Sequence, residues 1–236
     1  MIKYLTALWV LLYFQVALSQ NNSGRITIHD TNVDPAGIVD ELPLAPPKTI
    51  GDTYIEDDWM LGDVELLNGK KIDRYPLKYD LKNNELDISY NGEVRTCPAE
   101  KIKYFSWNKV GQKNAVKFVN TTYLINVKKG NPREVMAQAY SGNLIGLYKQ
   151  YYLDFKESTY VPALDMGNKN NKILVKSYYY VLQNNEFFKL SMTLRKNKIL
   201  FGGKYTEVEN HSKENKLKLK KEEDLIKLIK FYETLL

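Results

Sequence analysis

The chain has 236 residues, of which 34 are Lys or Arg and 28 are Asp or Glu, so its formal net charge is +6. A chain of this length can bury a core without covalent staples, which matters because Cys97 is its only cysteine. A single cysteine excludes an intramolecular disulfide framework. Together with only two histidines, His29 and His211, it leaves too few ligands for a zinc site, and the sequence predicts no metal and no cofactor.

Residues 1–19 have the three parts of a secretory signal peptide. Lys3 is followed by an uncharged apolar stretch from Tyr4 to Val16, and Ala17-Leu18-Ser19 places small residues at the −3 and −1 positions of a cleavage site. The stretch is shorter than the roughly 20 residues of a membrane-spanning helix. We therefore expect export with no transmembrane segment in the mature chain, and an uncleaved interfacial anchor is the alternative.

Export changes how the basic charge is interpreted. The excess is modest and comes mainly from lysine. In an exported protein it indicates a solvated surface, or attraction to anionic lipid headgroups or acidic polysaccharide, and it does not indicate nucleic-acid binding.

Residues 20–50 are predicted to be a flexible or extended N-terminal segment. Residues 25–29 alternate in the manner of a short strand. Residues 32–50 then hold four prolines, which remove the backbone donors that a sheet ladder needs.

Residues 51–110 carry the strongest strand pattern and are predicted to form a β-meander of about five strands. Asn68-Gly69 and Asn91-Gly92 lie between alternating runs, and both residues of such a pair tolerate the positive φ of a hairpin turn. A short helical turn is expected after Pro98. Such a meander can curl into a small open barrel or form one half of a sandwich.

Residues 111–236 are predicted to be a second β-rich half that ends in an amphipathic helix. Strands are expected at 115–119, 122–125, 134–140, 144–152, 172–182 and 186–190, with a loop at 156–171. The alternation in residues 216–221 indicates a lysine-protected edge strand or a basic patch.

A helix is expected from Glu222 to Leu236, because acidic residues suit a helix N-terminus and Leu225, Leu228, Ile229 and Tyr232 share one face. That face either packs on the sheet or docks on a partner. The predicted fold class is mostly β with a C-terminal α-helix.

Four segments of the chain carry a resemblance: Pro76-Leu77-Lys78-Tyr79 with the preceding Asn68-Gly69 turn, Pro162 to Gly167, Tyr178-Tyr179-Tyr180, and the lysine-rich run before a helix that contains Phe231-Tyr232. Their layout resembles uncharacterised exported proteins of Bacteroidetes, over most of the mature chain. No activity is assigned to that group. The resemblance therefore implies a bacterial envelope setting and carries no catalytic residue to this sequence.

Carboxylates are the remaining source of catalytic chemistry, because the chain has no Gly-x-Ser-x-Gly elbow, no P-loop and no Gly-x-Gly-x-x-Gly. Glu56, Asp57 and Asp58 are the most concentrated acidic site and precede Trp59. Such a cluster can bind calcium or serve as acid and base on a sugar. The alternative is a solvated loop.

Tyrosine is the most unusual component of the composition, with 18 residues in the chain. The candidate ligand-binding residues are Tyr148, Tyr151, Tyr152, Tyr178 and Tyr180. A tyrosine ring offers an apolar face with a polar tip, which suits a sugar or a protein surface. The alternative is packing on sheet faces, for which tyrosine has a high propensity.

These observations favour a non-catalytic binding or interaction module of the cell envelope whose partner is a glycan or a protein. The first alternative is a hydrolase that acts on polysaccharide or peptide through a carboxylate pair including Glu56, Asp57 or Asp58. The second is a structural accessory whose C-terminal helix docks on a partner. The sequence does not choose between periplasm, outer-membrane association and secretion.

Overall fold

The computed structural model describes residues 46–108, 114–124 and 135–236. The chain divides at Pro46, so the described residues belong almost entirely to the unit from Pro47 to Leu236. The predictions for the signal peptide and for a strand at 25–29 fall outside the described residues.

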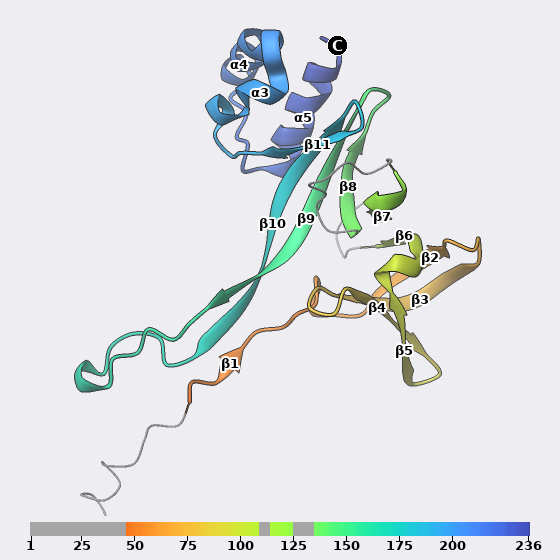
Figure 1. Cartoon of the computed structure of the whole chain (residues 1–236), viewed down its shortest axis with the longest axis vertical. Helices are drawn as coiled ribbons and strands as arrows, with labels where there is room; N and C mark the ends of the chain where they lie inside the picture. The colour runs from red at the N-terminus through yellow and green to blue at the C-terminus, as the bar shows by residue number, and fades with distance from the viewer. Residues whose placement is uncertain (1–45, 109–113, 125–134) are drawn as a thin grey trace, which may run out of the picture. The chain divides into compact units, whose positions relative to one another are not determined.

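The described strands form one mixed sheet, shown in Figure 1. They are β1 (Thr49–Ile50), β2 (Met60–Leu66), β3 (Lys71–Asp80), β4 (Glu85–Tyr90), β5 (Glu93–Pro98), β6 (Ile102–Trp107), β7 (Val116–Asn120), β8 (Val135–Ser141), β9 (Ile145–Lys156), β10 (Asn171–Gln183) and β11 (Glu186–Leu190). Their order is β1-β10-β9-β8-β7-β6-β2-β3-β4-β5, and β11 also pairs with β10. All the pairings are antiparallel except that of β1 with β10.

Helices follow β11 at the C-terminal end of the chain (Figure 1). They are α3 (Lys198–Phe201), α4 (Tyr205–Glu214) and α5 (Glu222–Glu233), and short 3-10 helices lie at η1 (Ala99–Lys101), η2 (Thr121–Tyr123), η3 (Pro162–Leu164), η4 (Leu194–Asn197) and η5 (Gly202–Lys204). The prediction of a mostly β fold with a C-terminal helical region is confirmed. In the part of the chain that the structure describes, no helix is both long and apolar enough to cross a membrane.

The predicted meander forms through the turns that the sequence marks. Gly69, Asn91 and Gly92 have positive φ values of 81°, 50° and 80°, as the two Asn-Gly turns require. The chain then passes through η1, and β6 returns to pair with the free edge of β2. Because β6 also pairs with β7, the two predicted halves share a single sheet.

Two local predictions in the second half are wrong. Thr121–Tyr123 form η2 and not the start of a strand, because the Asn120 side chain accepts a hydrogen bond from the Thr122 backbone N–H at 3.1 Å and stabilises a turn. Residues 216–221 are not an edge strand either. Leu219 is buried there, in the cluster that also contains α5, so tertiary packing overrides the alternating pattern.

Two main apolar clusters hold the fold. The N-terminal cluster includes Phe105 and Phe118, whose stacked rings lie 4.6 Å apart. The C-terminal cluster joins β9 and β10 to α3, α4 and α5, and it buries Leu225, Leu228, Ile229 and Tyr232. The apolar face of α5 therefore packs on the rest of the described chain, as predicted by the alternative in which this face packs on the sheet.

Strand β9 contributes to both clusters from one face. Leu147 lies in the C-terminal cluster, and Tyr151 and Leu153 pack against the N-terminal cluster. Successive side chains of a strand alternate between faces, so Lys149 lies on this same face between the two groups. Lys149 therefore lies between the C-terminal cluster and the N-terminal cluster.

Candidate functional site

Lys149 lines a cavity of about 210 Å³. The residues that line it come from β7 and the two residues before it, from β8 and β9, from the start of α5 and from the loop before β2. They are Glu56, Asn114, Ala115, Val116, Phe118, Ala137, Gln138, Ala139, Lys149, Tyr151 and Glu222. We call this space the Lys149 cavity.

The charged centre of the cavity is an ion pair between the sheet and α5. Lys149 Nζ lies 2.9 Å from Glu222 Oε2, and the hydroxyl of Tyr179 donates to the same oxygen at 2.6 Å. Tyr179 is the direct cross-strand partner of Lys149, which explains why both side chains reach one carboxylate. Glu222 is the first residue of α5, so its carboxylate also suits the positive end of that helix.

The surroundings fix the protonation of this centre. Burial by itself lowers the pKa of Lys149, but the neighbouring Tyr151 and the hydrogen-bonded Glu222 outweigh it, so the net pKa lies above the usual value. Burial raises the pKa of Tyr179, and the bond to Glu222 raises it further. Lys149 therefore stays charged at neutral pH and is suited to hold a ligand, and it is not suited to act as a base or an amine nucleophile.

An aromatic and apolar wall completes the cavity. The rings of Phe118 and Tyr151 lie 6.2 Å apart with an interplanar angle of 34°. The Lys149 ammonium lies 5.2 Å from the centre of the Tyr151 ring. Burial is the main cause of the raised pKa of Tyr151; the nearby Lys149 ammonium lowers that pKa, and the Glu222 carboxylate raises it. The phenol thus remains a hydrogen-bond donor at neutral pH.

The structure separates the three acidic candidates. Glu56 lines the Lys149 cavity, whereas Asp57 and Asp58 are exposed and do not line it. The backbone oxygen of Asp57 accepts a hydrogen bond from Lys78. Of the three carboxylates, the structure therefore places only Glu56 in this cavity.

The five tyrosines do not form one site either. Tyr151 alone lines the Lys149 cavity. On the opposite face of the same strands, Tyr152 and Tyr178 stack with centroids 4.3 Å apart and an interplanar angle of 4°. Lys189 Nζ lies 3.2 Å from the centre of the Tyr178 ring. The side-chain hydrogen bond with Tyr178, with some burial, raises the pKa of Tyr152 to about 12.

Tyr148 and Tyr180 are mainly packing residues. Tyr148 is buried in a small third cluster with Val119 and Met136, and Tyr180 packs against that cluster. The Phe187 ring meets the Tyr148 ring edge-on at 5.6 Å.

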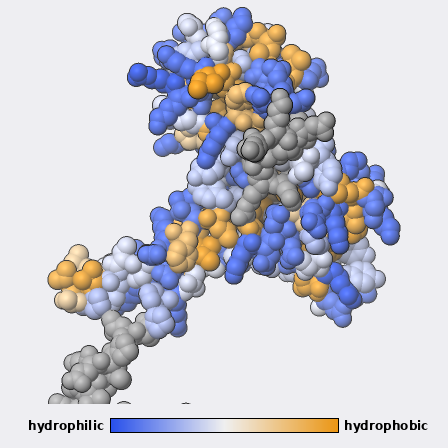
Figure 2. Space-filling view, viewed as in Figure 1, coloured by the Kyte–Doolittle hydropathy of each residue, from blue (hydrophilic) through white to orange (hydrophobic). Residues whose placement is uncertain are grey.

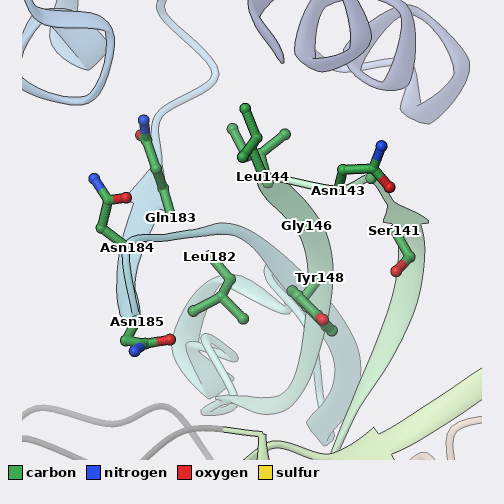
Figure 3. A pocket seen from close by; sticks show the side chains of 11 residues that line it. Ser141, Asn143, Leu144, Gly146, Tyr148, Leu182, Gln183, Asn184 and Asn185 are labelled. Carbon is green, nitrogen blue, oxygen red and sulfur yellow. The ribbon is translucent and has the colours of Figure 1, made fainter. Parts of the chain in front are cut away.

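Tyr148 also reaches a second pocket of about 320 Å³ between two hairpin turns. In Figure 3, Asn184 and Asn185 lie on one side of this pocket and Leu144 lies on the other. Four of its eleven lining residues carry a side-chain amide, and none of the eleven is charged. It therefore presents no charged group to a ligand, whereas the lining of the Lys149 cavity includes Lys149, Glu56 and Glu222.

Sequence reasoning missed Lys149, Tyr179 and Glu222. Lys149 had a detectable signal, because it interrupts an otherwise apolar face of β9 made by Ile145, Leu147 and Leu153. Glu222 gave only the signal of a helix start, and its role depends on a contact with a residue 73 positions earlier.

The remaining candidate groups are metal ligands and the Cys97 thiol. Within the described ranges, no group of three or more His, Cys, Asp and Glu side chains is arranged to hold a metal ion. Cys97 is half-buried in β5, and burial raises the pKa of its thiol, as expected for a small packing residue. Comparison with protein-family models, curated proteins and solved structures finds no match for this chain.

Proposed function

We propose that this protein is an exported, envelope-associated binding module that holds a hydroxyl-rich ligand, such as one sugar unit of an envelope glycan, in the Lys149 cavity. One observation carries the proposal. Glu56 and Tyr151, a carboxylate and an aromatic residue from distant segments, line the same cavity as the Lys149–Glu222 pair. A cavity where a few polar groups converge on an apolar wall is the usual form of a small-ligand site.

The chemistry of the cavity suits a sugar. Phe118 and Tyr151 offer ring surface to the apolar face of a pyranose, and tyrosine also provides a hydroxyl donor. Lys149 donates, while Glu56 and Glu222 accept, so neighbouring sugar hydroxyls can be bound as donors and acceptors. The volume is below the 300 Å³ or so of drug-sized pockets, which favours a single small ring over a long chain.

The envelope location is supported by the sequence. The signal-peptide pattern of residues 1–19 supports export, and the resemblance that includes Pro76 to Tyr79 supports a bacterial envelope. Periplasm, outer-membrane association and secretion are all consistent with this proposal.

The test is binding of purified exported protein to envelope polysaccharide fractions and to the monosaccharides released from them. We expect Lys149→Met and Tyr151→Leu to weaken binding by about tenfold or more, because each removes a contact worth more than 1 kcal/mol. Tyr152→Leu is the matched control, since Tyr152 lies on the opposite face of the same strand. Failure to retain any glycan, or equal loss in the control, refutes the proposal.

A hydrolase remains the second candidate because two carboxylates, Glu56 and Glu222, line one cavity. In such an enzyme Glu222, which is paired with Lys149, would serve as the carboxylate and Glu56 as the acid. If Glu56→Gln and Glu222→Gln abolish turnover of a polysaccharide or peptide, while Asp57→Asn with Asp58→Asn does not, the protein is an enzyme and not a binding module.

A further inference from the structure

The β9–β10 hairpin continues beyond the strands that flank it. Along the described chain, β8 follows β9 only as far as the pairing of Ala137 with Lys149, and β11 meets β10 only from Tyr179 onward. The outer part of the hairpin has β1 as its strand neighbour, at Asn171 and Lys172. Figure 1 shows the two strands running past β8 and β11 to their connecting turn. We call residues 155–172, with Lys48 to Ile50 beside them, the arm tip.

The arm tip has a defined structure. The Ser158 backbone N–H donates to Asn171 Oδ1 at 2.8 Å, and the Ser158 hydroxyl donates to the Asn168 carbonyl at 2.8 Å. At the turn, Val161 N–H donates to the Met166 carbonyl at 2.8 Å. These bonds close the loop on itself and present its side chains in a fixed arrangement.

Large apolar side chains are exposed on this ordered tip. The exposed fractions are 67% for Leu164, 65% for Met166, 55% for Phe155, 52% for Ile50 and 46% for Val161. Figure 2 shows hydrophobic residues gathered at the end of the hairpin. Exposed apolar side chains gathered at one end of a hairpin mark an interaction surface, because isolated exposed leucines are common but grouped ones are not.

Lysines accompany the apolar residues of the arm tip, and Lys156 and Lys172 face each other across the two strands where the hairpin begins to turn. The arm tip contains Lys48, Lys156, Lys169 and Lys172, which are all exposed, and its carboxylates are Glu157 and Asp165. Asp165 is already occupied, since it pairs with Lys169 at 3.1 Å and accepts the Tyr160 hydroxyl at 2.8 Å. The remaining ammonium groups give the rim of the patch a positive charge.

We propose that the arm tip docks on an anionic lipid surface, with Leu164 and Met166 entering the acyl boundary and the lysines reaching the headgroups. The arrangement fits because an apolar centre with a lysine rim is what interfacial binding requires, and lysine stems can lie along apolar surface while their ammonium groups stay hydrated. A purely apolar protein partner would leave the ammonium rim without complementary charge. The inference rests on the proposed envelope location, where such a surface is present.

The test is co-sedimentation of the full exported protein with vesicles of phosphatidylcholine, with and without phosphatidylglycerol. We expect binding to the anionic vesicles that weakens as salt is added. Leu164→Ser with Met166→Ser should weaken it by about tenfold or more, because two apolar side chains lose their transfer into lipid. Lys156→Glu with Lys172→Glu should remove the preference for anionic vesicles.

Ile199→Ser is the matched control, because Ile199 is 87% exposed but lies in α3. The apolar residues of the tip are exposed, so their replacement should leave the unfolding transition unchanged. Absence of vesicle binding, equal loss in the control, or concentration-dependent self-association that the tip variants abolish would overturn the inference. If glycan binding survives while vesicle binding is absent, only the lipid inference fails and the proposed function stands.

Discussion

Replacing Lys149 with Met tests whether the ion pair in the cavity ties α5 to the sheet. Methionine retains much of the aliphatic stem and removes the ammonium, so charge changes more than packing does. At 2.9 Å, two unit charges attract by about 1.4 kcal/mol in a water-like dielectric and by more in a partly buried site. The side chains of Lys149 and Glu222 are 23% and 41% exposed, so desolvation and solvent screening offset part of that gain. We expect the free energy of unfolding to fall by about 1 to 2 kcal/mol.

The assay is urea denaturation of Lys149→Met, Glu222→Gln and the double variant. The three values form a double-mutant cycle, which isolates the energy of the pair. We expect a coupling energy of about 1 kcal/mol that shrinks at high salt. The comparison pair is Lys213–Glu209 on α4, at 3.2 Å and with the lysine 69% exposed, for which about 0.3 to 0.5 kcal/mol is expected. A cavity coupling no larger than the α4 coupling would refute the argument that burial strengthens this pair.

Three further predictions address the fold. Leu228→Ala should lower the free energy of unfolding by about 3 kcal/mol, because Leu228 is fully buried in the C-terminal cluster. The control Ile199→Ala should change it by less than about 0.5 kcal/mol. If urea denaturation gives similar losses for the two variants, α5 is a docking helix and not part of the core. Asn120→Ala should lower the free energy of unfolding by about 2 kcal/mol in the same assay. The buried Nδ2 of Asn120 donates to the carbonyls of Ala99 at 3.1 Å and Ile102 at 3.0 Å, and the substitution leaves both without this donor. A negligible loss would show that water takes the place of the Asn120 amide. The Leu144 backbone N–H and the Tyr140 hydroxyl lower the pKa of Glu233, so its stabilisation is present above its unfolded-state pKa near 4.5 and is lost as pH falls through the lower folded value. Glu233→Gln should therefore lose less stability than the parent when pH falls below 4.5, and identical pH profiles would contradict this.

The turns were predictable because each is encoded by adjacent residues. Asn68-Gly69 and Asn91-Gly92 tolerate positive φ, and the structure uses that tolerance at both turns. The same holds for Asn184 and Asn185, with φ values of 50° and 62° between β10 and β11. The strand prediction for residues 216–221 was wrong because adjacent residues do not determine their conformation. Their alternation matches a strand, but Leu219 is buried in a cluster with residues of β9 and β10, and that tertiary contact decides their conformation.

Some residues of the Lys149 cavity could be predicted from residue type, whereas the contact between Lys149 and Glu222 could not. Glu56 and Tyr151 were candidates because carboxylates and tyrosines suit ligand binding wherever they lie. Consecutive tyrosines must also alternate between faces, and Tyr179 indeed lies on the cavity side while Tyr178 stacks on the other side. No local pattern indicates that Glu222 meets Lys149, because that pairing exists only after the sheet and α5 have come together.

The position of the cavity has a thermodynamic consequence. Phe118 belongs to the N-terminal cluster, while Glu222 begins the helix that covers the C-terminal cluster, so a ligand in the cavity contacts parts of both. Because such a site forms only when both clusters are in place, a ligand binds the folded chain and not the unfolded one. Its occupancy at one hundred times the Kd should raise the free energy of unfolding by about 2.7 kcal/mol. In Lys149→Met the same ligand concentration should stabilise far less, whereas Tyr152→Leu should retain the full increase, and differential scanning calorimetry measures both. Equal stabilisation of the two variants would place the ligand outside the Lys149 cavity.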